Sequence, residues 1–146
     1  MLVYTTPVLA HDVEVTGPVV VTLYAATSAV DTDFTAKLVD VHPDGYARNL
    51  TDSIIRGRYR ESKARGTLLK PGEVYEYTID VWATSNVFKA GHRIRVEVAS
   101  SNFPRFDRNP QTGERSGEAS QLEPALQHVF HDELRPSHVV LPIIPR

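Results

Sequence analysis

The chain has 146 residues, enough for one domain with a sizeable core, and its 41% hydrophobic and 23% charged residues exclude wholesale disorder. A formal net charge of −2 gives no reason to expect nucleic acid or a membrane surface as a partner. Because the sequence has no cysteine, it excludes disulfides, thiol nucleophiles and cysteine-ligated zinc.

The N-terminus lacks the charged and apolar regions of a signal peptide, and no apolar run approaches the roughly 20 residues that span a bilayer. A strand-like run at residues 2–4 follows Met1 at once. This abrupt start predicts a fragment of a longer protein. The missing signal favours a cytoplasmic location, although a fragment would not show the N-terminus of its parent.

Short β-forming runs alternate with turn residues along the whole chain. Turn residues such as Gly17 and Pro18 divide the first two runs, Pro43 to Gly45 predicts a hairpin, and Gly57 predicts a bulge. The predicted strands cover residues 13–16, 19–27, 34–42, 46–50, 54–60, 75–81, 94–98 and 138–144.

The clearest alternation places Tyr75, Tyr77, Ile79 and Val81 on one face of a strand, which predicts that this face lies in the core. Trp82 follows one step beyond Val81 and is expected to face outward. It is therefore the best single candidate for an aromatic platform.

Two features distinguish the C-terminal part. Residues 121–130 form the only plausible short helix, with Pro124 in its first turn. Pro142 predicts that residues 138–144 form an edge strand or a bent one. Eight or nine short strands without helical crossovers predict an all-β, antiparallel sandwich of the jelly-roll or Greek-key kind, spanning residues 1–146 as one domain.

The sequence shows no hydrolase nucleophile. The G-x-S-x-G pentapeptide of a nucleophile elbow is absent. Ser116 and Ser137 are followed by Gly117 and His138, but neither serine lies between a strand and a helix, so both are interpreted as ordinary loop and strand-start residues.

We expect no metal and no cofactor. The crowded C-terminal histidines, His128, His131 and His138, lack carboxylate-rich zinc spacing and are interpreted as surface and capping residues. The other three lie in separate turn-flanking segments and predict no common site; they are His11, His42 and His92.

Asp31 and Asp33 have the alternate spacing of calcium-loop carboxylates. The glycine turn and the distal glutamate of an EF-hand are absent. Hydrogen bonds from nearby backbone N–H groups are the favoured interpretation of this pair, and a structural calcium is the alternative.

The loop that follows the strand at residues 94–98 mixes aromatic and charged side chains, which is typical of a contact surface. The hypothesis is that a docking face is formed by Asn102, Phe103, Arg105, Phe106 and Arg108. The alternative is that Phe103 and Phe106 lie under their own loop as a satellite core.

Five strings carry a resemblance that covers essentially the whole chain, in order: DTDFTAKLVDVHPDG, LLKPGEVYEYTIDVW, ATSNVFKAGHRIRVEV, SSNFPRFDRNPQTG and PSHVVLPIIP. The chain resembles the C-terminal non-catalytic domain of the X-Pro dipeptidyl-peptidase, cocaine esterase and α-amino acid ester hydrolase family, the CocE/NonD-type serine hydrolases. The resemblance implies a jelly-roll sandwich similar to galactose-binding-like domains.

The same resemblance implies a role. Members of the family are serine hydrolases of peptide, amide or ester bonds, and their Ser-Asp-His triad lies in an upstream α/β-hydrolase domain that this sequence does not contain. No catalytic residue is therefore transferred to this chain, which is expected to be inactive alone. The expected role is to pack on the catalytic domain, wall part of the substrate entrance and support homo-oligomers.

Two other functions stay open. A carbohydrate-binding module is one, with Trp82 as its platform, because the same sandwich hosts sugar-binding proteins. A self-associating structural domain is the other, with an exposed sheet edge as its interface and Pro142 as an imperfect guard.

Overall fold

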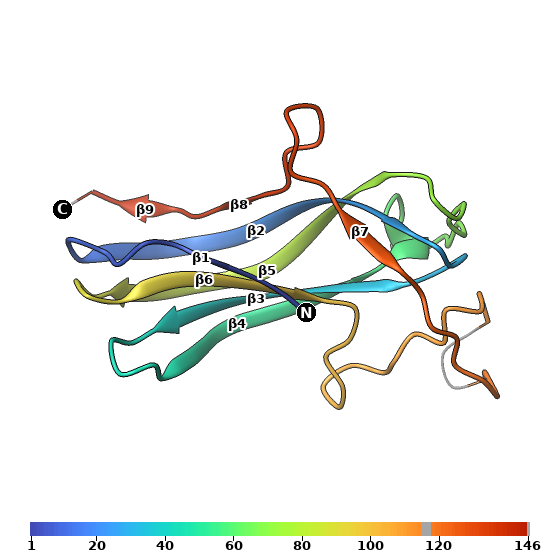
Figure 1. Ribbon diagram of the computed structural model, residues 1–146, viewed down its shortest axis with the longest axis horizontal. Coiled ribbons are helices and arrows are strands. Elements are labelled where there is room, and N and C mark those ends of the chain that lie inside the picture. The colour runs from blue at the N-terminus through green and yellow to red at the C-terminus, as the bar shows by residue number, and fades with distance from the viewer. Residues whose placement is uncertain (115–117, 146) are drawn as a thin grey trace.

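Two antiparallel sheets face each other across one hydrophobic core in the computed structural model, which describes residues 1–114 and 118–145 (Figure 1). In chain order the strands are β1 (Leu2–Thr5), β2 (Val13–Thr27), β3 (Asp33–Val41), β4 (Ala47–Arg56), β5 (Tyr75–Phe88), β6 (Arg93–Ala99), β7 (Gln127–Val129), β8 (His138–Val140) and β9 (Ile143–Ile144). Sheet A has the order β1-β6-β3-β4; in sheet B, β2 pairs with β5 and also with β7, β8 and β9. The predicted all-β antiparallel sandwich is confirmed, while its jelly-roll connectivity stays a prediction.

The core is built from alternate residues of both sheets, as the period of two in a strand requires. Tyr77, Ile79 and Val81 of β5 are all buried, so the predicted apolar face of this strand is confirmed. The Tyr77 ring packs on Phe34 of β3, with 4.8 Å between the ring centroids. Burial raises the pKa of the Tyr77 hydroxyl, which keeps this contact between the sheets uncharged.

The break predicted at Gly17 and Pro18 does not occur, because β2 runs through both residues. The pairing passes from Pro18 opposite Ala83 to Val20 opposite Asp80, so the extra residue of this bulge lies on β5. Gly17 has a φ of +136°, and a Cβ there would lie 3.0 Å from Cγ of Pro142. Glycine therefore lets the C-terminal segment approach β2 closely.

The two strands predicted at residues 46–50 and 54–60 are one strand, β4, and the predicted bulge at Gly57 is wrong. Gly57 instead begins a 3₁₀ turn, η1 (Gly57–Tyr59). A Cβ at Gly57 would lie 2.9 Å from Cδ1 of Leu69 and 3.1 Å from the carbonyl oxygen of Thr32. The lack of a side chain, rather than an irregularity in the strand, explains this glycine.

The helix predicted at residues 121–130 is also wrong, since part of it forms β7 and pairs with the end of β2. Ser28 N–H donates to the Leu126 carbonyl and Phe130 N–H donates to the Tyr24 carbonyl, which extends this pairing at both ends. Hydrogen bonds along the edge of β2 outweigh the weak local preference for a helix. Among the described residues, no helix has the length and apolar character needed to cross a membrane.

The C-terminal run lies at the edge of sheet B and is interrupted at Pro142, which separates β8 from β9. Both short strands pair with β2, β8 at residues 20–22 and β9 at residues 14 and 15. The prediction of an edge strand bent by proline is therefore confirmed.

A buried group of polar side chains, the Asp31–Asn109 network, joins the start of β3 to the end of β4 and to the segment that follows β6. Arg56 Nε and Nη2 donate to Asp33 at 2.9 and 3.1 Å, and Arg58 Nε donates to Asp31 at 2.7 Å. Asn109 Nδ2 donates to both carboxylates, at 3.0 Å to Asp31 and 2.8 Å to Asp33. The hydrogen bonds from Arg56 to Asp33 raise the pKa of the Arg56 guanidinium.

The network corrects the favoured interpretation of the aspartate pair. Asp31 and Asp33 are 0% and 1% exposed, and the Arg58 amide, 3.0 Å from Asp31, is the one backbone N–H bonded to them in the described contacts. Side-chain guanidinium and amide groups supply the other donors. Charge neutralisation, rather than turn formation, accounts for the pair.

Replacing Asp31 with Ala is expected to lower the free energy of unfolding by about 3–5 kcal/mol, because it leaves the largely buried Arg58 without its carboxylate. Urea denaturation followed by circular dichroism measures this change. The matched control is Glu73→Ala, which removes an exposed pair with Lys70 and should change the stability little. Equal effects of the two substitutions would contradict this role of the network.

Candidate functional site

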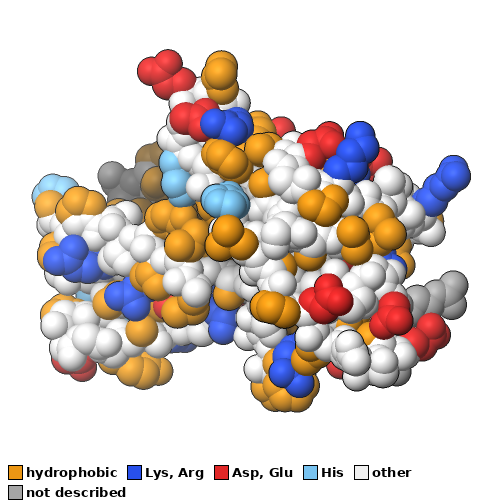
Figure 2. All heavy atoms as spheres, turned by 45° about the vertical axis from the view of Figure 1, so that its right-hand side comes forward, with side chains coloured by type: hydrophobic (Ala, Val, Ile, Leu, Met, Phe, Trp, Pro, Cys, Tyr) orange, Lys and Arg blue, Asp and Glu red, His pale blue; other side chains and the backbone are white. Residues whose placement is uncertain are grey.

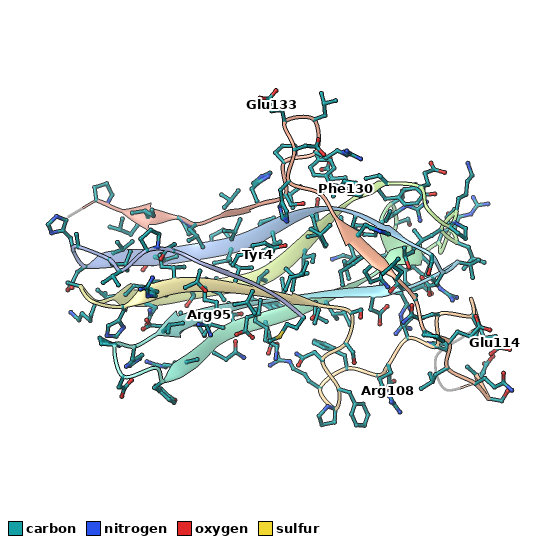
Figure 3. The ribbon with its side chains drawn as sticks, in the orientation of Figure 1. Tyr4, Arg95, Arg108, Glu114, Phe130 and Glu133 are labelled. Atoms are coloured by element: carbon teal, nitrogen blue, oxygen red, sulfur yellow. The ribbon has the colours of Figure 1, made fainter. Side chains whose placement is uncertain are left out.

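The segment after β6 makes a tight turn that leaves the sandwich at its lower side (Figure 1). Phe106 N–H donates to the Asn102 carbonyl at 3.2 Å, and the Phe103–Pro104 peptide bond inside this turn is cis. The turn thus gathers the predicted docking residues on one loop, residues 102–108. It projects away from the strands, as the position of Arg108 shows (Figure 3).

The loop is held at its middle and at its C-terminal end by side-chain contacts. Arg105 Nε lies 3.0 Å from Oδ1 of Asp52, a buried carboxylate on β4. At the far end, Asn109 is buried in the Asp31–Asn109 network, and Arg58 Nη2 donates to the carbonyls of Gly113 and Glu114 at 2.8 and 2.9 Å. These contacts fix the loop to sheet A.

The two phenylalanines of the loop have different environments. Phe103 is 63% exposed, with the Arg108 guanidinium 5.4 Å from its ring centroid. Phe106 is half-buried and lines a cavity of about 270 Å³ with residues that include Ile54 and Tyr59. The satellite-core interpretation therefore fails for Phe103, which lies open to solvent, while Phe106 packs beside sheet A.

The surface of the molecule shows the same mixture. A projection of hydrophobic and basic side chains lies at its lower edge, at the height of the 102–108 loop (Figure 2). Asn102, the remaining member of the predicted face, is half-buried, and its amide nitrogen is buried without a hydrogen-bond partner in the structure. The arrangement offers apolar and cationic contacts, and Phe103 is its most accessible apolar group.

Trp82 also faces outward, and it lies 62% exposed at the β2–β5 bulge. Its φ of 66° is uncommon for a residue with a side chain, and its backbone N–H donates to Asp80 Oδ1 at 2.9 Å. The extra residue of the bulge explains the exposure. In the described contacts no second aromatic ring stacks with Trp82, so an aromatic platform here consists of a single indole.

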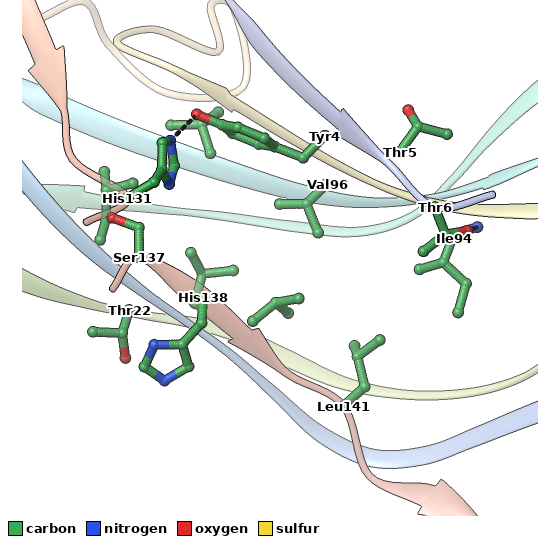
Figure 4. Close-up of a pocket in the computed structure, with 14 residues that line it drawn as sticks. Tyr4, Thr5, Thr6, Thr22, Ile94, Val96, His131, Ser137, His138 and Leu141 are labelled. Atoms are coloured by element: carbon green, nitrogen blue, oxygen red, sulfur yellow. Dashed lines mark hydrogen bonds between the residues drawn. The ribbon is translucent and has the colours of Figure 1, made fainter. Parts of the chain in front are cut away.

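A second cavity, of about 360 Å³, opens between the β1–β6 side of sheet A and the β2–β8 side of sheet B (Figure 4). Valine, isoleucine and leucine make up half of the residues that line it. At its polar end the Tyr4 hydroxyl and His131 Nε2 are hydrogen-bonded at 2.8 Å, and burial raises the pKa of Tyr4. No sequence pattern predicts this cavity, because β1 and β8 lie at opposite ends of the chain.

The serine and the two histidines beside this cavity are not arranged for nucleophilic catalysis. Ser137 Oγ accepts a hydrogen bond from Tyr24 N–H at 2.9 Å, and His138 Nδ1 donates to the Pro136 carbonyl at 2.7 Å. His131 Nε2 bonds Tyr4, and in the described contacts neither imidazole is hydrogen-bonded to Ser137 Oγ, so the nucleophile–base pair of a serine hydrolase is not formed here. Ser116, the other serine considered above, lies outside the described residues.

Two histidines expected to be separate lie together in the structure. The rings of His42 and His92 are tilted by 36°, with 4.3 Å between their centroids, and Asp40 lies beside both. The expectation that these two histidines lie apart is therefore wrong, because the antiparallel pairing of β3 with β6 brings their strand ends side by side.

Comparison with known proteins identifies the relatives of this fold. Residues 1–140 match the family described as the X-Pro dipeptidyl-peptidase C-terminal non-catalytic domain. The cocaine esterase of Rhodococcus sp. (strain MB1 Bresler) is 53% identical over 148 residues, which cover 100% of this chain and 26% of that protein.

Solved structures give the same result. A crystal structure of an aminopeptidase from a marine sediment Thaumarchaeota archaeon has a TM-score of 0.94 and 38% identity, covering 99% of this chain and 26% of that one. An α-amino acid ester hydrolase has a TM-score of 0.92 and 32% identity, covering 98% of this chain and 25% of that one. The chain thus spans about a quarter of the length of these relatives. It belongs to the X-Pro dipeptidyl-peptidase C-terminal non-catalytic domain family, whose members are found in CocE/NonD-type hydrolases.

Proposed function

We propose that this domain packs on the α/β-hydrolase catalytic domain of a longer serine hydrolase and shapes access to its substrate site. The single observation that carries the docking face is Phe103, an apolar side chain that is open to solvent on a loop fixed at its middle and at its C-terminal end. Aromatic side chains flanked by arginine are enriched where protein surfaces dock, and Arg108 lies over the Phe103 ring.

The charges of the loop support a specific orientation in this docking. Arg105 is paired with Asp52, whereas Arg108 lies beside an exposed ring. The Arg108 guanidinium is thus placed to meet a carboxylate or a carbonyl group of the catalytic domain. Asn102 and Phe106, which are half-buried, would support the loop from below rather than form the centre of the contact.

Homo-oligomerisation and a cytoplasmic location belong to the same proposal. Sheet A ends at β1 and β4, and the exposed Leu2, Val3 and Tyr4 of β1 are apolar groups that a second copy could cover. Light scattering should give a multiple of the 16.3 kDa mass of one chain. A mass of 16.3 kDa would contradict self-association. Fractionation of the source cells checks the location.

A chimera tests the docking face. This chain would replace the matching C-terminal part of the Rhodococcus cocaine esterase, to which it is 53% identical. Phe103→Ala is expected to weaken docking by about 1–2 kcal/mol, the cost of truncating an interface anchor, and so to lower the midpoint of thermal inactivation of ester hydrolysis.

The control in the chimera is Leu134→Ala, which truncates a side chain that is 89% exposed on a different loop. A second control is the isolated chain, where Phe103→Ala should leave the free energy of unfolding within about 0.5 kcal/mol. Docking through Phe103 is refuted if both truncations inactivate the chimera alike, or if Phe103→Ala destabilises the isolated chain as much as the chimera.

The chain alone is expected to show no hydrolase activity. Ser137 Oγ accepts from the Tyr24 amide, and in the described contacts neither His131 nor His138 is hydrogen-bonded to it, so no base is in place to activate this serine. A chromogenic ester and an X-Pro anilide should both be hydrolysed at the rate of the blank. Turnover that disappears in Ser137→Ala would contradict this prediction.

A further inference from the structure

A cluster of two imidazoles and a carboxylate lies at the end of sheet A, where the β3–β4 and β5–β6 turns meet. Asp40 on β3 pairs with Ile94 on β6, and Val41 pairs with Arg93. His42 and His92 are the next residues beyond these pairs, so the register itself places them side by side. Asp40, His42 and His92 are called the His42–His92 cluster below.

The donor atoms of the cluster are close enough to share one ion. One ligand atom from each residue lies within 4.8 Å of the others. His92 Nδ1–H donates to Asp40 Oδ1 at 2.8 Å, and His42 Nε2 lies 3.8 Å from Asp40 Oδ2. An ion with bonds of about 2.0–2.2 Å to nitrogen and oxygen would draw these atoms together by small side-chain rotations. Because a ligating nitrogen carries no proton, coordination by His92 Nδ1 moves its proton to Nε2 of the same ring.

His42 Nε2 provides an independent observation. This atom is buried and has no hydrogen-bond partner in the structure, although a buried ring nitrogen normally has one. The ring is held in place, because His42 N–H donates to the Tyr46 carbonyl and the Tyr46 ring packs edge-on at 5.2 Å. His42 Nε2 is thus fixed beside a carboxylate and a second imidazole, and it makes no hydrogen bond. Such a nitrogen can donate its lone pair to a metal ion.

We propose that the His42–His92 cluster binds a divalent transition-metal ion of the zinc class. Two imidazoles and one carboxylate suit this class, whereas Ca²⁺ and Mg²⁺ prefer oxygen ligands alone. Three protein ligands leave a fourth position for water. The ion acts as a cross-link between the β3–β4 turn and the β5–β6 turn, and this role is separate from the docking proposed for the 102–108 loop.

Spectroscopy of the unchanged chain tests the site directly. Co²⁺ titrated into the metal-free chain should give the intense visible d–d absorption of a four-coordinate nitrogen–oxygen site, saturating at one equivalent, and Zn²⁺ should abolish it. Zn²⁺ should also raise the midpoint of thermal unfolding, because it binds the folded state. The site is refuted if Co²⁺ gives only the weak spectrum of the hydrated ion.

Variants assign the ligands. His42→Gln and His92→Gln should each weaken Zn²⁺ binding at least 10-fold in calorimetry, since losing a ligand costs no less than losing a supporting contact around it. His11→Ala removes an exposed histidine outside the cluster and should leave the affinity unchanged. Equal affinities in all variants, or an equal loss in His11→Ala, would assign the ion to surface histidines instead. If a glutamine variant does not fold, the Co²⁺ spectrum of the unchanged chain still decides.

Discussion

The paired buried carboxylates of Asp31 and Asp33 are the constraint on which the arrangement of this domain depends. Two carboxylates in the interior repel each other and lose their hydration, so they are tolerated only where cations and hydrogen-bond donors surround them. Arg56 and Arg58 supply the charge, and Asn109 joins the two acids by donating to both. Because Asn109 lies 78 residues from Asp31 in sequence, this requirement for hydrogen-bond donors also determines where the long segment after β6 must run.

The same requirement explains how the domain holds an aromatic group in solvent. The 102–108 loop lies between β6 and Asn109, two fixed points, and Arg105 adds a third contact at Asp52. A single exposed phenylalanine is common on protein surfaces and carries little meaning alone. A phenylalanine on a loop that is already ordered is different, because the loop loses little further conformational entropy when a partner binds. The buried ion pairs thus hold the loop in one conformation, with Phe103 exposed to a partner.

The parts of the structure that follow from local pattern could be predicted from the sequence, and those that follow from pairing could not. Alternation identified the buried face of β5, and Pro142 identified the bent edge of sheet B. The continuity of β2 and the strand β7 depend on partners far along the chain, so glycine, proline and helix preferences gave wrong boundaries there. One signal was available for the buried network: Asp31 and Asp33, two residues apart, are matched by Arg56 and Arg58 with the same spacing.

Strand β3 carries a buried carboxylate near each end, Asp33 and Asp40, and the two carboxylates have partners of different chemistry. Seven residues of strand separate them by about 24 Å at 3.4 Å per residue. At Asp33 the partner is a guanidinium with a permanent charge, which gives a fixed ion pair beside the loop. At Asp40 the partners are imidazoles, whose ring nitrogens are common metal ligands. The proposed metal site therefore lies at the end of β3 remote from the docking loop. An ion bound there stabilises the sandwich while the loop keeps its conformation.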